Sequence, residues 1–459
     1  MLTLYNSLSR RKEAFRPRVE GKVGMYVCGI TVYDDCHVGH GRSMLVYDIL
    51  YRHLLALGYE VSYVRNITDV DDKIIRRALE NGEAPEALAE RYIKAMHDDE
   101  AALGVLSPSE EPRATAAIES MHALIDTLIA SGHAYAVEGS DVFYAVRAFP
   151  DYGKLSGRKP DELRAGERVA VDEDKRDPLD FVLWKAAKEG EPAWPSPWGP
   201  GRPGWHIECS AMAKDTLGDQ FDIHGGGLDL KFPHHENEIA QSEAANGVPL
   251  ANYWVHSGLI TVGDDKMSKS LGNFLTIGQA LEDWSGEELR LFMVSSHYRS
   301  PLAFHDEALQ AARTVLRRFY TALRGREGGA PLIEDTVARF DLAMNDDLNT
   351  PEAMAVLHEL AADINRESDI ASEHSRQLVS TLLALGDRLG LLQNDPEAVL
   401  KGEGGAGALS DGEIESLIAE RAEARSNKDW AASDRIRDQL AEAGVVLEDK
   451  GSETLWRRG

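Results

Sequence analysis

Apolar positions near the start of the chain follow two different periods, and together they predict a parallel sheet. Residues 25–30 and 61–67 are short β-prone runs, and residues 43–57 between them have the period of an amphipathic helix. A strand, a helix and a strand at this spacing form a βαβ unit, in which the strands are parallel. Ligands of such sheets bind at the carboxyl ends of the strands, so we expect a site near residues 28–40 and 68–72.

The next part of the chain interrupts this pattern. Residues 85–132 have the period of two amphipathic helices, and β-prone runs at 134–137 and 142–146 flank a glycine-containing turn, which predicts a hairpin. The run 194–205 is crowded with proline, glycine and tryptophan, and we expect it to be an irregular loop. Because sheet-like strands resume only after this run, we interpret residues 96–200 as an inserted subdomain.

The remainder of the chain is predominantly helical after residue 302. A glycine-rich stretch at 402–409 predicts a linker, and Ser410 with Glu413 behind it has the pattern of a capping box that starts another helix. The predicted fold class is α/β, with the following organisation. A Rossmann-type parallel-sheet catalytic domain (1–95 and 201–309) carries the inserted subdomain (96–200) and is followed by a helical bundle (310–401), the linker (402–409) and a small C-terminal α+β module (410–459).

Composition limits the class of protein. With 43% hydrophobic and 28% charged residues the chain is an ordinary globular protein, and no apolar run reaches the ~18 residues of a membrane-spanning helix. The first residues lack the pattern of a secretory signal, so we expect a cytoplasmic protein with no membrane partner. Fifty basic against 77 acidic residues give a net charge of −27, which opposes non-specific binding to DNA and restricts any nucleic-acid contact to a local basic face.

A first chemical motif follows the first predicted strand. His37, Gly39 and His40 stand at the start of the first long helix. Imidazoles and backbone amides can donate to a phosphate there, and a glycine lets the phosphate come close. A motif this short also occurs by chance, so an ordinary pair of loop histidines is the alternative.

A second motif is the sequence KMSKSLGN at 266–273, which follows a predicted strand at 259–262. Lys266, Ser268 and Lys269 would form a basic loop suited to a developing pyrophosphate, and a solvated basic turn is the alternative. An HxGH motif early and a KMSKS motif late, both after strands, resemble the signature of class I aminoacyl-tRNA synthetases.

A third group of residues has the chemistry of a metal site. His234 and Glu238 are four residues apart in a predicted helix, and Cys28 and Cys209 each end a strand-like segment. Two cysteines, a histidine and a carboxylate form a set of four ligands suited to zinc. Spacing alone does not separate His234 from His235, and cysteines buried in the core are the alternative to a metal site.

The whole pattern resembles the cysteinyl-tRNA synthetase family nearly from end to end. The segments that carry the resemblance are 24–34, 37–42, 66–73, 204–210, 224–229 and 233–238. The resemblance implies one zinc ion per chain on Cys28, Cys209, His234 and Glu238. Cys36 matches none of these positions, and we expect it to pack as a small apolar side chain.

The resemblance also implies the reaction and the residues that serve it. ATP, accompanied by Mg²⁺, would activate L-cysteine to cysteinyl-adenylate, and the cysteinyl group would pass to the 3′ terminal adenosine of tRNA(Cys). The implied catalytic residues are His37, His40, Lys266 and Lys269; the implied ATP contacts are Gly39, Gly225, Gly226, Gly227, Asp229, Lys266, Ser268 and Lys269; and the implied substrate contacts are Gly29, Thr68 and Trp205. For the glycine run a flexible turn is the alternative, and for Trp205 it is packing in the core.

The final module resembles the part of the family that reads the anticodon. Trp456, Arg457 and Arg458 offer a stacking plane and two cations to single-stranded RNA, while a tryptophan that closes a small core is the alternative. One rival function is a ligase of the mycothiol type, which joins cysteine to an amino sugar with the same adenylation site but lacks the terminal module. Another is a catalytically silent relative that binds RNA or protein. We expect the protein to be a monomer.

Overall fold

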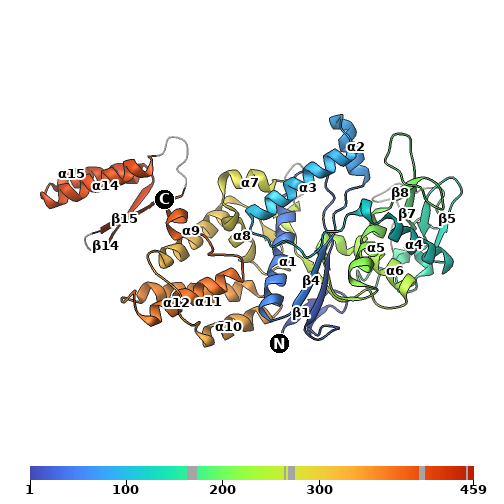
Figure 1. The fold of residues 1–459 in the computed structure, drawn as a ribbon, viewed down its shortest axis with the longest axis horizontal. Coiled ribbons are helices and arrows are strands. Elements are labelled where there is room, and N and C mark those ends of the chain that lie inside the picture. The colour runs from blue at the N-terminus through green and yellow to red at the C-terminus, as the bar shows by residue number, and fades with distance from the viewer. Residues whose placement is uncertain (163–172, 263–264, 267–273, 403–408, 451–452, 459) are drawn as a thin grey trace. The chain divides into compact units, whose positions relative to one another are not determined.

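The computed structural model describes residues 1–162, 173–262, 265–266, 274–402, 409–450 and 453–458 (Figure 1). The chain forms two compact units. The first consists of Met1–Ala312, Ala338–Val356 and Arg388–Gly390, and the second consists of Arg313–Val337, Leu357–Asp387 and Leu391–Gly459. Most of the predicted linker, residues 403–408, lies outside the described residues. No helix of the described chain is both long and apolar enough to cross a membrane.

A four-stranded parallel sheet forms the centre of the first unit. Its strands, in order, are β10 (Ala251–Ser257), β9 (Phe221–Gly227), β3 (Lys22–Val27) and β4 (Glu60–Arg65). The helix α1 (Val38–Ala56) connects β3 to β4, which confirms the predicted βαβ unit. In register, Val27 of β3 lies beside Gly225 of β9, and Gly225 lies beside Val255 of β10. The carboxyl ends of strands far apart in the sequence therefore meet at one edge.

Helices cover both faces of this sheet. In Figure 1, α1 lies on one side of the strands, and α5 (Trp205–Leu217) and α6 (His234–Asn246) lie on the other. The helix α1 begins five residues earlier than predicted, because His37 serves as its N-cap. Its hydroxyl-bearing residue Tyr47 is fully buried and donates to the carbonyl of Gly226 or Val255, each at 2.8 Å. The helix is thereby tied to two strands.

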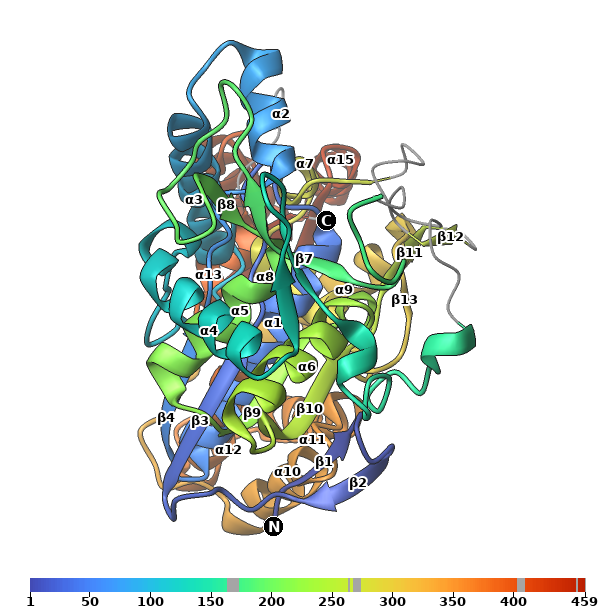
Figure 2. The same cartoon turned by 90° about the vertical axis from the view of Figure 1, so that its right-hand side faces the viewer.

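A second four-stranded sheet of the first unit is antiparallel, in the order β5 (Ala134–Ala136), β6 (Val142–Tyr144), β7 (Phe181–Ala186) and β8 (Gly201–Pro203). Figure 2 labels β7 and β8; β8 lies just beyond the segment 96–200 that we interpreted as an inserted subdomain. The predicted hairpin is confirmed as β5 and β6. The prediction of an irregular loop over 194–205 was wrong at its end, where β8 pairs with β7 and α5 begins at Trp205. Proline is tolerated in β8 because this strand lies at the edge of the sheet, where one side of the backbone needs no ladder partner.

Smaller elements complete the first unit. They are β1 (Thr3–Asn6), β2 (Arg11–Ala14), α2 (Asp72–Asn81), α3 (Pro85–Ala102), η1 (Ala114–Ala116), α4 (Ile118–Ala130), η2 (Val146–Ala148), η3 (Pro160–Glu162), η4 (Leu228–Lys231), β11 (Ile260–Val262), β12 (Asp265–Lys266), α7 (Ile277–Asp283), α8 (Gly286–Val294) and β13 (Leu302–Ala303). The strands β12, β11 and β13 form a separate small sheet at the place where the lysine motif begins.

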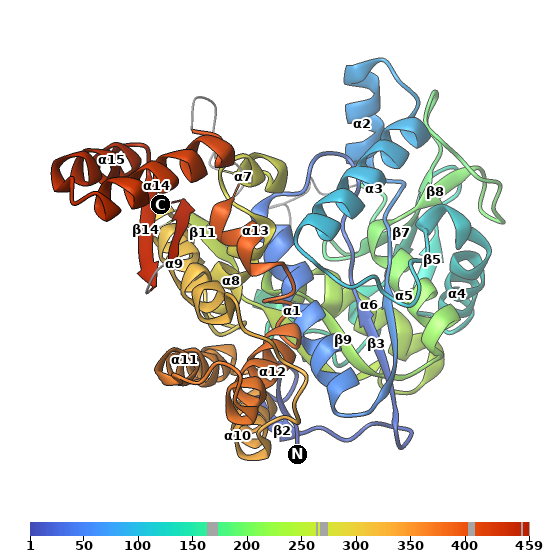
Figure 3. The ribbon, with the colours of Figure 1, turned by 60° about the vertical axis from the view of Figure 1, so that its left-hand side comes forward.

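The rest of the chain is helical, as predicted. Its helices are α9 (Asp306–Leu323), α10 (Glu334–Asn345), α11 (Thr350–Arg366), α12 (Glu373–Asp387) and α13 (Pro396–Lys401). In the terminal module α14 (Asp411–Ser426) packs against α15 (Trp430–Glu442), and β14 (Val445–Lys450) pairs with β15 (Glu453–Arg458) as an antiparallel hairpin (Figure 3). The predicted capping box is confirmed, since Ser410 and Glu413 each bond to the backbone N–H of the other.

Candidate active site and metal centre

The four predicted metal ligands come together at the carboxyl edge of the sheet. Cys28 follows the end of β3, and His234 and Glu238 lie one turn apart on α6. The expectation that Cys209 ends a strand-like segment was wrong, because it lies within the helix α5. Their ligand atoms all lie within 4.8 Å of one another, and all four residues are buried. Cys28 Sγ lies 3.7 Å from Cys209 Sγ and 3.2 Å from Glu238 Oε1, and His234 Nε2 lies 3.1 Å from the same oxygen. This donor set suits zinc.

The electrostatics of the cluster also favour a cation. Burial raises the pKa of the Cys28 thiol well above its ordinary value, whereas the hydrogen bond from Cys28 lowers the pKa of Cys209 to about 6. Burial alone would raise the pKa of Glu238, but the neighbouring imidazoles of His224 and His234 hold it below its ordinary value. The pair of cysteines therefore shares a proton next to a buried carboxylate, and a divalent cation could take the place of that proton.

Histidines that the sequence analysis missed surround the four ligands. His224 on β9 places Nε2 2.8 Å from Glu238 Oε2, and His206 on α5 places Nδ1 2.9 Å from the Nδ1 of His234. Each contact fixes the orientation of a ligand side chain (Glu238 or His234), as the outer hydrogen bonds of metal sites usually do. His224 lies on a strand, separated in sequence from the other ligands, and gives no local signal. His206 precedes Cys209 by three residues on α5, and this helical spacing is the signal that could have found it.

The three predicted substrate contacts have different surroundings. Trp205 is 37% exposed and stacks on the ring of His234, with 4.2 Å between ring centroids, so it lies over a ligand rather than in the core. At Gly29 a side chain would overlap the carbonyl oxygen of Asn66, which explains the glycine. Thr68 is buried, and its hydroxyl donates to Glu208 at 2.9 Å.

The HxGH motif forms the first turn of α1. His37 Nδ1 accepts from the N–H of His40 at 3.2 Å, His40 Nδ1 accepts from the N–H of His37 at 3.3 Å, and the two rings stack with centroids 3.6 Å apart. A side chain at Gly39 would come within 2.8 Å of the His37 ring. The two imidazoles thus form one rigid group at the positive end of a 19-residue helix, a favourable place for phosphate.

The residues that follow the lysine motif lie next to this group. Lys266 ends β12, and Ser268 and Lys269 lie outside the described residues. Where the description resumes, the chain pairs with the HxGH segment: Val38 N–H donates to Leu275 at 3.0 Å, and Ile277 N–H donates to Cys36 at 2.8 Å. Leu275 and Ile277 are therefore fixed beside the first turn of α1.

The predicted nucleotide-binding glycines belong to β9, so the alternative of a flexible turn was wrong. A side chain at Gly225 would overlap the ring of Tyr47, and one at Gly226 would come within 2.7 Å of the His235 ring. Gly227 ends the strand, and Asp229 follows it, exposed, on η4. Packing inside the protein thus requires glycine at 225 and 226, whatever binds at the strand end.

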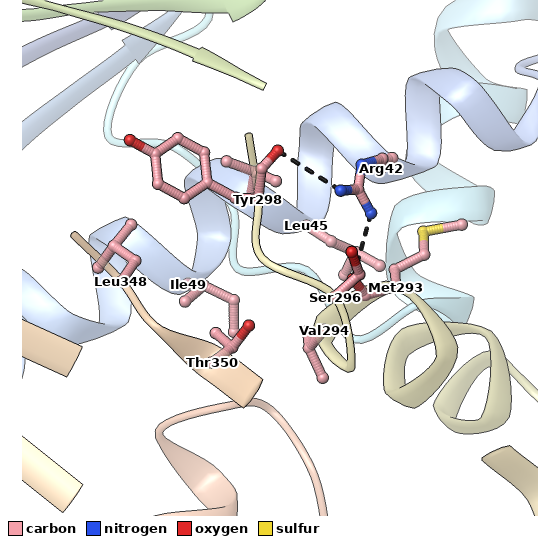
Figure 4. Close-up of a pocket in the computed structure, with 10 residues that line it drawn as sticks. Arg42, Leu45, Ile49, Met293, Val294, Ser296, Tyr298, Leu348 and Thr350 are labelled. Carbon is pink, nitrogen blue, oxygen red and sulfur yellow. Dashed lines mark hydrogen bonds between the residues drawn. The ribbon is translucent and has the colours of Figure 1, made fainter. Parts of the chain in front are cut away.

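A pocket lies beside α1 and contains none of the predicted site residues (Figure 4). It is lined by Arg42, Leu45, Val46, Ile49, Met293, Val294, Ser296, Tyr298, Leu348 and Thr350. The Arg42 guanidinium is buried, and burial lowers its pKa to about 10. It donates to the carbonyls of Met293 at 3.3 Å and Ser300 at 2.8 Å, so it fixes the end of α8 and the following turn on the helix of the HxGH motif.

In the terminal module, Trp456 has the core position that was the alternative to RNA stacking. It is 3% exposed and packs with Ile414, Leu440 and Val445. Arg458 donates to Asp411 at 2.6 Å, and Arg457 donates to Glu448 at 3.3 Å. All three predicted RNA-binding side chains therefore also have contacts within the module.

Comparison with known proteins places this geometry in a family. Residues 14–314 match the catalytic domain of class I (C) tRNA synthetases, residues 339–393 a DALR domain, and residues 409–457 the cysteinyl-tRNA ligase anticodon binding domain. The chain is 58% identical over 464 residues to the cysteine–tRNA ligase of Methylococcus capsulatus and 60% identical over 461 residues to that of Thioalkalivibrio sulfidiphilus, with 100% of each chain covered. The chain belongs to the cysteine–tRNA ligase family. It is therefore a class I aminoacyl-tRNA ligase specific for cysteine, and the amino-sugar ligase is not favoured.

Solved structures of other synthetases share the fold of this family member. The methionyl-tRNA synthetase of Mycobacterium tuberculosis, in complex with methionyl-adenylate, is 15% identical and has a TM-score of 0.54, with 82% of this chain and 90% of that chain covered. The Agrobacterium radiobacter K84 agnB2 LeuRS–tRNA–LeuAMS ternary complex is 12% identical and has a TM-score of 0.59, with 84% and 85% covered. These likenesses confirm the predicted parallel-sheet fold of a class I synthetase.

Proposed function

We propose that this chain activates L-cysteine with ATP to cysteinyl-adenylate and transfers the cysteinyl group to the 3′ terminal adenosine of tRNA(Cys). The observation that carries the proposal is the buried group of Cys28, Cys209, His234 and Glu238 at the carboxyl edge of the sheet. The stacked histidines of α1 belong to the same edge, because only ten residues separate the end of β3 from the start of α1. A soft ligand site and a phosphate-binding turn in one place suit the activation of a thiol-containing amino acid.

Zinc is the ion that we assign to the four ligands, one per chain. When bound, it offers a soft coordination position to the substrate thiolate, and thiolate binds zinc much better than a hydroxyl does. A pocket that relies on shape alone separates similar side chains by only ~10–200-fold. The ligand set therefore explains how cysteine can be selected over serine. Trp205, Gly29 and Thr68 would surround the amino acid, with the Trp205 ring over His234.

The chemistry needs positioned charges rather than acid–base groups. The cysteine carboxylate attacks the α-phosphorus of ATP, and pyrophosphate leaves; a ribose hydroxyl of the tRNA then attacks the activated carbonyl, and AMP leaves. His37 and His40, at the positive end of α1, would bind the phosphates. Lys266, Lys269 and Ser268 would stabilise the leaving pyrophosphate. Gly39, Gly225, Gly226, Gly227 and Asp229 would contact ATP, which brings its Mg²⁺ with it.

The RNA contacts and the assembly are also part of the proposal. The terminal module would read the anticodon, with Arg457 and Arg458 offering cations and Trp456 holding the strand that carries them. The net charge of −27 keeps other polyanions away, so contact with tRNA depends on local basic groups. We expect a monomer that works in the cytoplasm, where charged tRNA is used.

The test is cysteine-dependent exchange of pyrophosphate into ATP, together with transfer of labelled cysteine to tRNA, with zinc-replete protein. Cys209→Ser should bind zinc more weakly and lower both activities by more than about a hundredfold, since a hydroxyl is a poor zinc ligand. Cys36→Ala is the matched control. Cys36 is buried but is not one of the candidate metal ligands among the described residues, so this variant should keep its zinc and its activity.

Three outcomes would contradict the proposal. Full activation of cysteine by Cys209→Ser would exclude selection through the metal. Cysteine-dependent exchange without charging of tRNA would point to another acceptor, such as an amino sugar. Absence of both activities in the unmodified protein would indicate a silent relative.

A further inference from the structure

A second group of candidate ligands overlaps the first. Cys28, His224, His235 and Glu238 also place their ligand atoms within 4.8 Å of one another, and all four are buried. The two groups share Cys28 and Glu238 and differ in the other two members. The first adds Cys209 and His234 from one side, and the second adds His224 from β9 and His235 from α6.

One side chain of the second group points to a cation directly. His235 is fully buried, and its Nε2 has no hydrogen-bond partner among the described residues. This nitrogen lies 4.0 Å from Glu238 Oε1, too far for a hydrogen bond but close enough for both atoms to reach one ion. A buried imidazole nitrogen without a partner costs free energy, and an ion bound between it and the carboxylate would remove that cost.

The other nitrogen of His235 has the support that metal-binding histidines have. Nδ1 lies 2.9 Å from His256 Nε2, and His256 Nδ1 lies 2.8 Å from the Ser7 hydroxyl oxygen. If each imidazole donates through Nδ1, the chain of hydrogen bonds ends on the Ser7 oxygen and leaves the lone pair of His235 Nε2 directed toward Glu238. An outer hydrogen bond of this kind fixes the tautomer and the orientation of a ligating imidazole.

We propose that Cys28, His224, His235 and Glu238 form a second cation position, which can hold a zinc-like divalent ion in place of the first. One thiolate, two imidazoles and one carboxylate suit Zn²⁺ or Co²⁺. The second position has His224 and His235 where the first has Cys209 and His234. An ion can therefore stay in the site when Cys209 is unavailable. The proposal rests on the metal centre of the proposed function but uses ligands outside it.

The test uses Co²⁺, whose near-ultraviolet absorption reports the number of bound thiolates. The double variant Cys209→Ser/His234→Ala removes two ligands of the first position and keeps all four of the second. It should bind one Co²⁺ with the absorption of one thiolate, whereas the unmodified chain should show two. Adding His235→Ala should lower the Co²⁺ affinity at least about tenfold. Adding His206→Ala instead should leave it unchanged, because the ring nitrogen of His206 bonds to His234, which the double variant removes, and His206 is absent from the second group.

Loss of Co²⁺ binding in the folded double variant, or binding that depends on His206 rather than His235, would overturn the proposal. If the double variant does not fold, the near-isosteric Cys209→Ser decides the question. In that background His235→Ala should lower the Co²⁺ affinity at least about tenfold, and in the unmodified chain by less than about threefold. Equal effects in both backgrounds would overturn the second position. The two-thiolate absorption of the unmodified chain tests the first position separately.

Discussion

Single buried side chains in this protein keep one protonation state because of what surrounds them. His53 on α1 is fully buried between Asn345 and Arg388. Its Nε2 lies 3.1 Å from Asn345 Oδ1, and Arg388 Nη2 donates to its Nδ1 at 3.1 Å. Burial, with the nearby cation of Arg388, lowers the pKa of His53 to about 4. The ring is therefore neutral in the folded state, with its proton on Nε2.

Because His53 is neutral in the folded protein, the free energy of unfolding should fall in mild acid. The unfolded chain binds a proton at His53 near pH 6.5, whereas the folded chain binds it only near pH 4, so stability is fully present above about pH 6.5 and falls through this window. His53 should contribute a loss of roughly 3 kcal/mol over the window. Urea unfolding at several pH values should show a shallower pH dependence for His53→Gln. An equal dependence in both proteins would exclude His53 as the cause.

At the scale of elements, the distance between α1 and the sheet decides the geometry of the site. The fully buried ring of Tyr47 lies against Gly225, and the backbone N–H of Gly226 also donates to its hydroxyl. Because α1 carries the HxGH turn and β9 leads to the glycine end of the sheet, this contact fixes the distance between two predicted binding segments. Arg42 on the same helix donates to the carbonyl of Met293 and so also fixes α1 to the end of α8.

Gly225→Ala should therefore destabilise the first unit. The new methyl group would overlap the Tyr47 ring, which is held by the carbonyls of Gly226 and Val255 and cannot turn away. Overpacking of this kind costs about 1–3 kcal/mol, and thermal unfolding should show a lower Tm. Gly278→Ala is the control, since nothing lies within 4 Å of its new methyl group and alanine favours a helix. Equal Tm changes for the two variants would contradict the packing argument.

At the scale of the whole molecule, the terminal module has a hydrophobic core of its own. Its buried members are Ile414, Leu440, Val445 and Trp456. A unit of about fifty residues buries little apolar surface, so its stability is small. In the proposed function this module binds the RNA, while the reaction with ATP takes place at the edge of the parallel sheet.

A cavity in that small core should separate the two half-reactions. Leu440→Ala should cost about 2–4 kcal/mol, which approaches the whole stability of such a module. Transfer of cysteine to tRNA should fall at least about tenfold, while cysteine-dependent pyrophosphate exchange stays within about twofold. Gln439→Ala, at an exposed position of α15, should change neither activity. A parallel loss of exchange in Leu440→Ala would show that activation also depends on the module.

Patterns within a few residues of one another determined much of this fold. The βαβ unit, the hairpin of β5 and β6, the helix that starts at His234 and the capping box at Ser410 all depend on local periodicity and local hydrogen bonds. Two local features were missed for physical reasons. Histidine is an uncommon N-cap, so the start of α1 was predicted too late, and an edge strand accepts a proline that an inner strand would not, so β8 was missed.

Only the tertiary structure decided which distant residues meet. The spacing of His234 and His235 did not separate them, and the fold directs both toward Glu238, each supported by a different histidine. His224 and His256 come from neighbouring parallel strands, and parallel pairing joins segments whose separation in the sequence carries no pattern. The local sequence therefore determined the helices and strands and the kinds of ligand side chain at the site. The alignment of the parallel strands decided how many of these side chains surround the position of the ion.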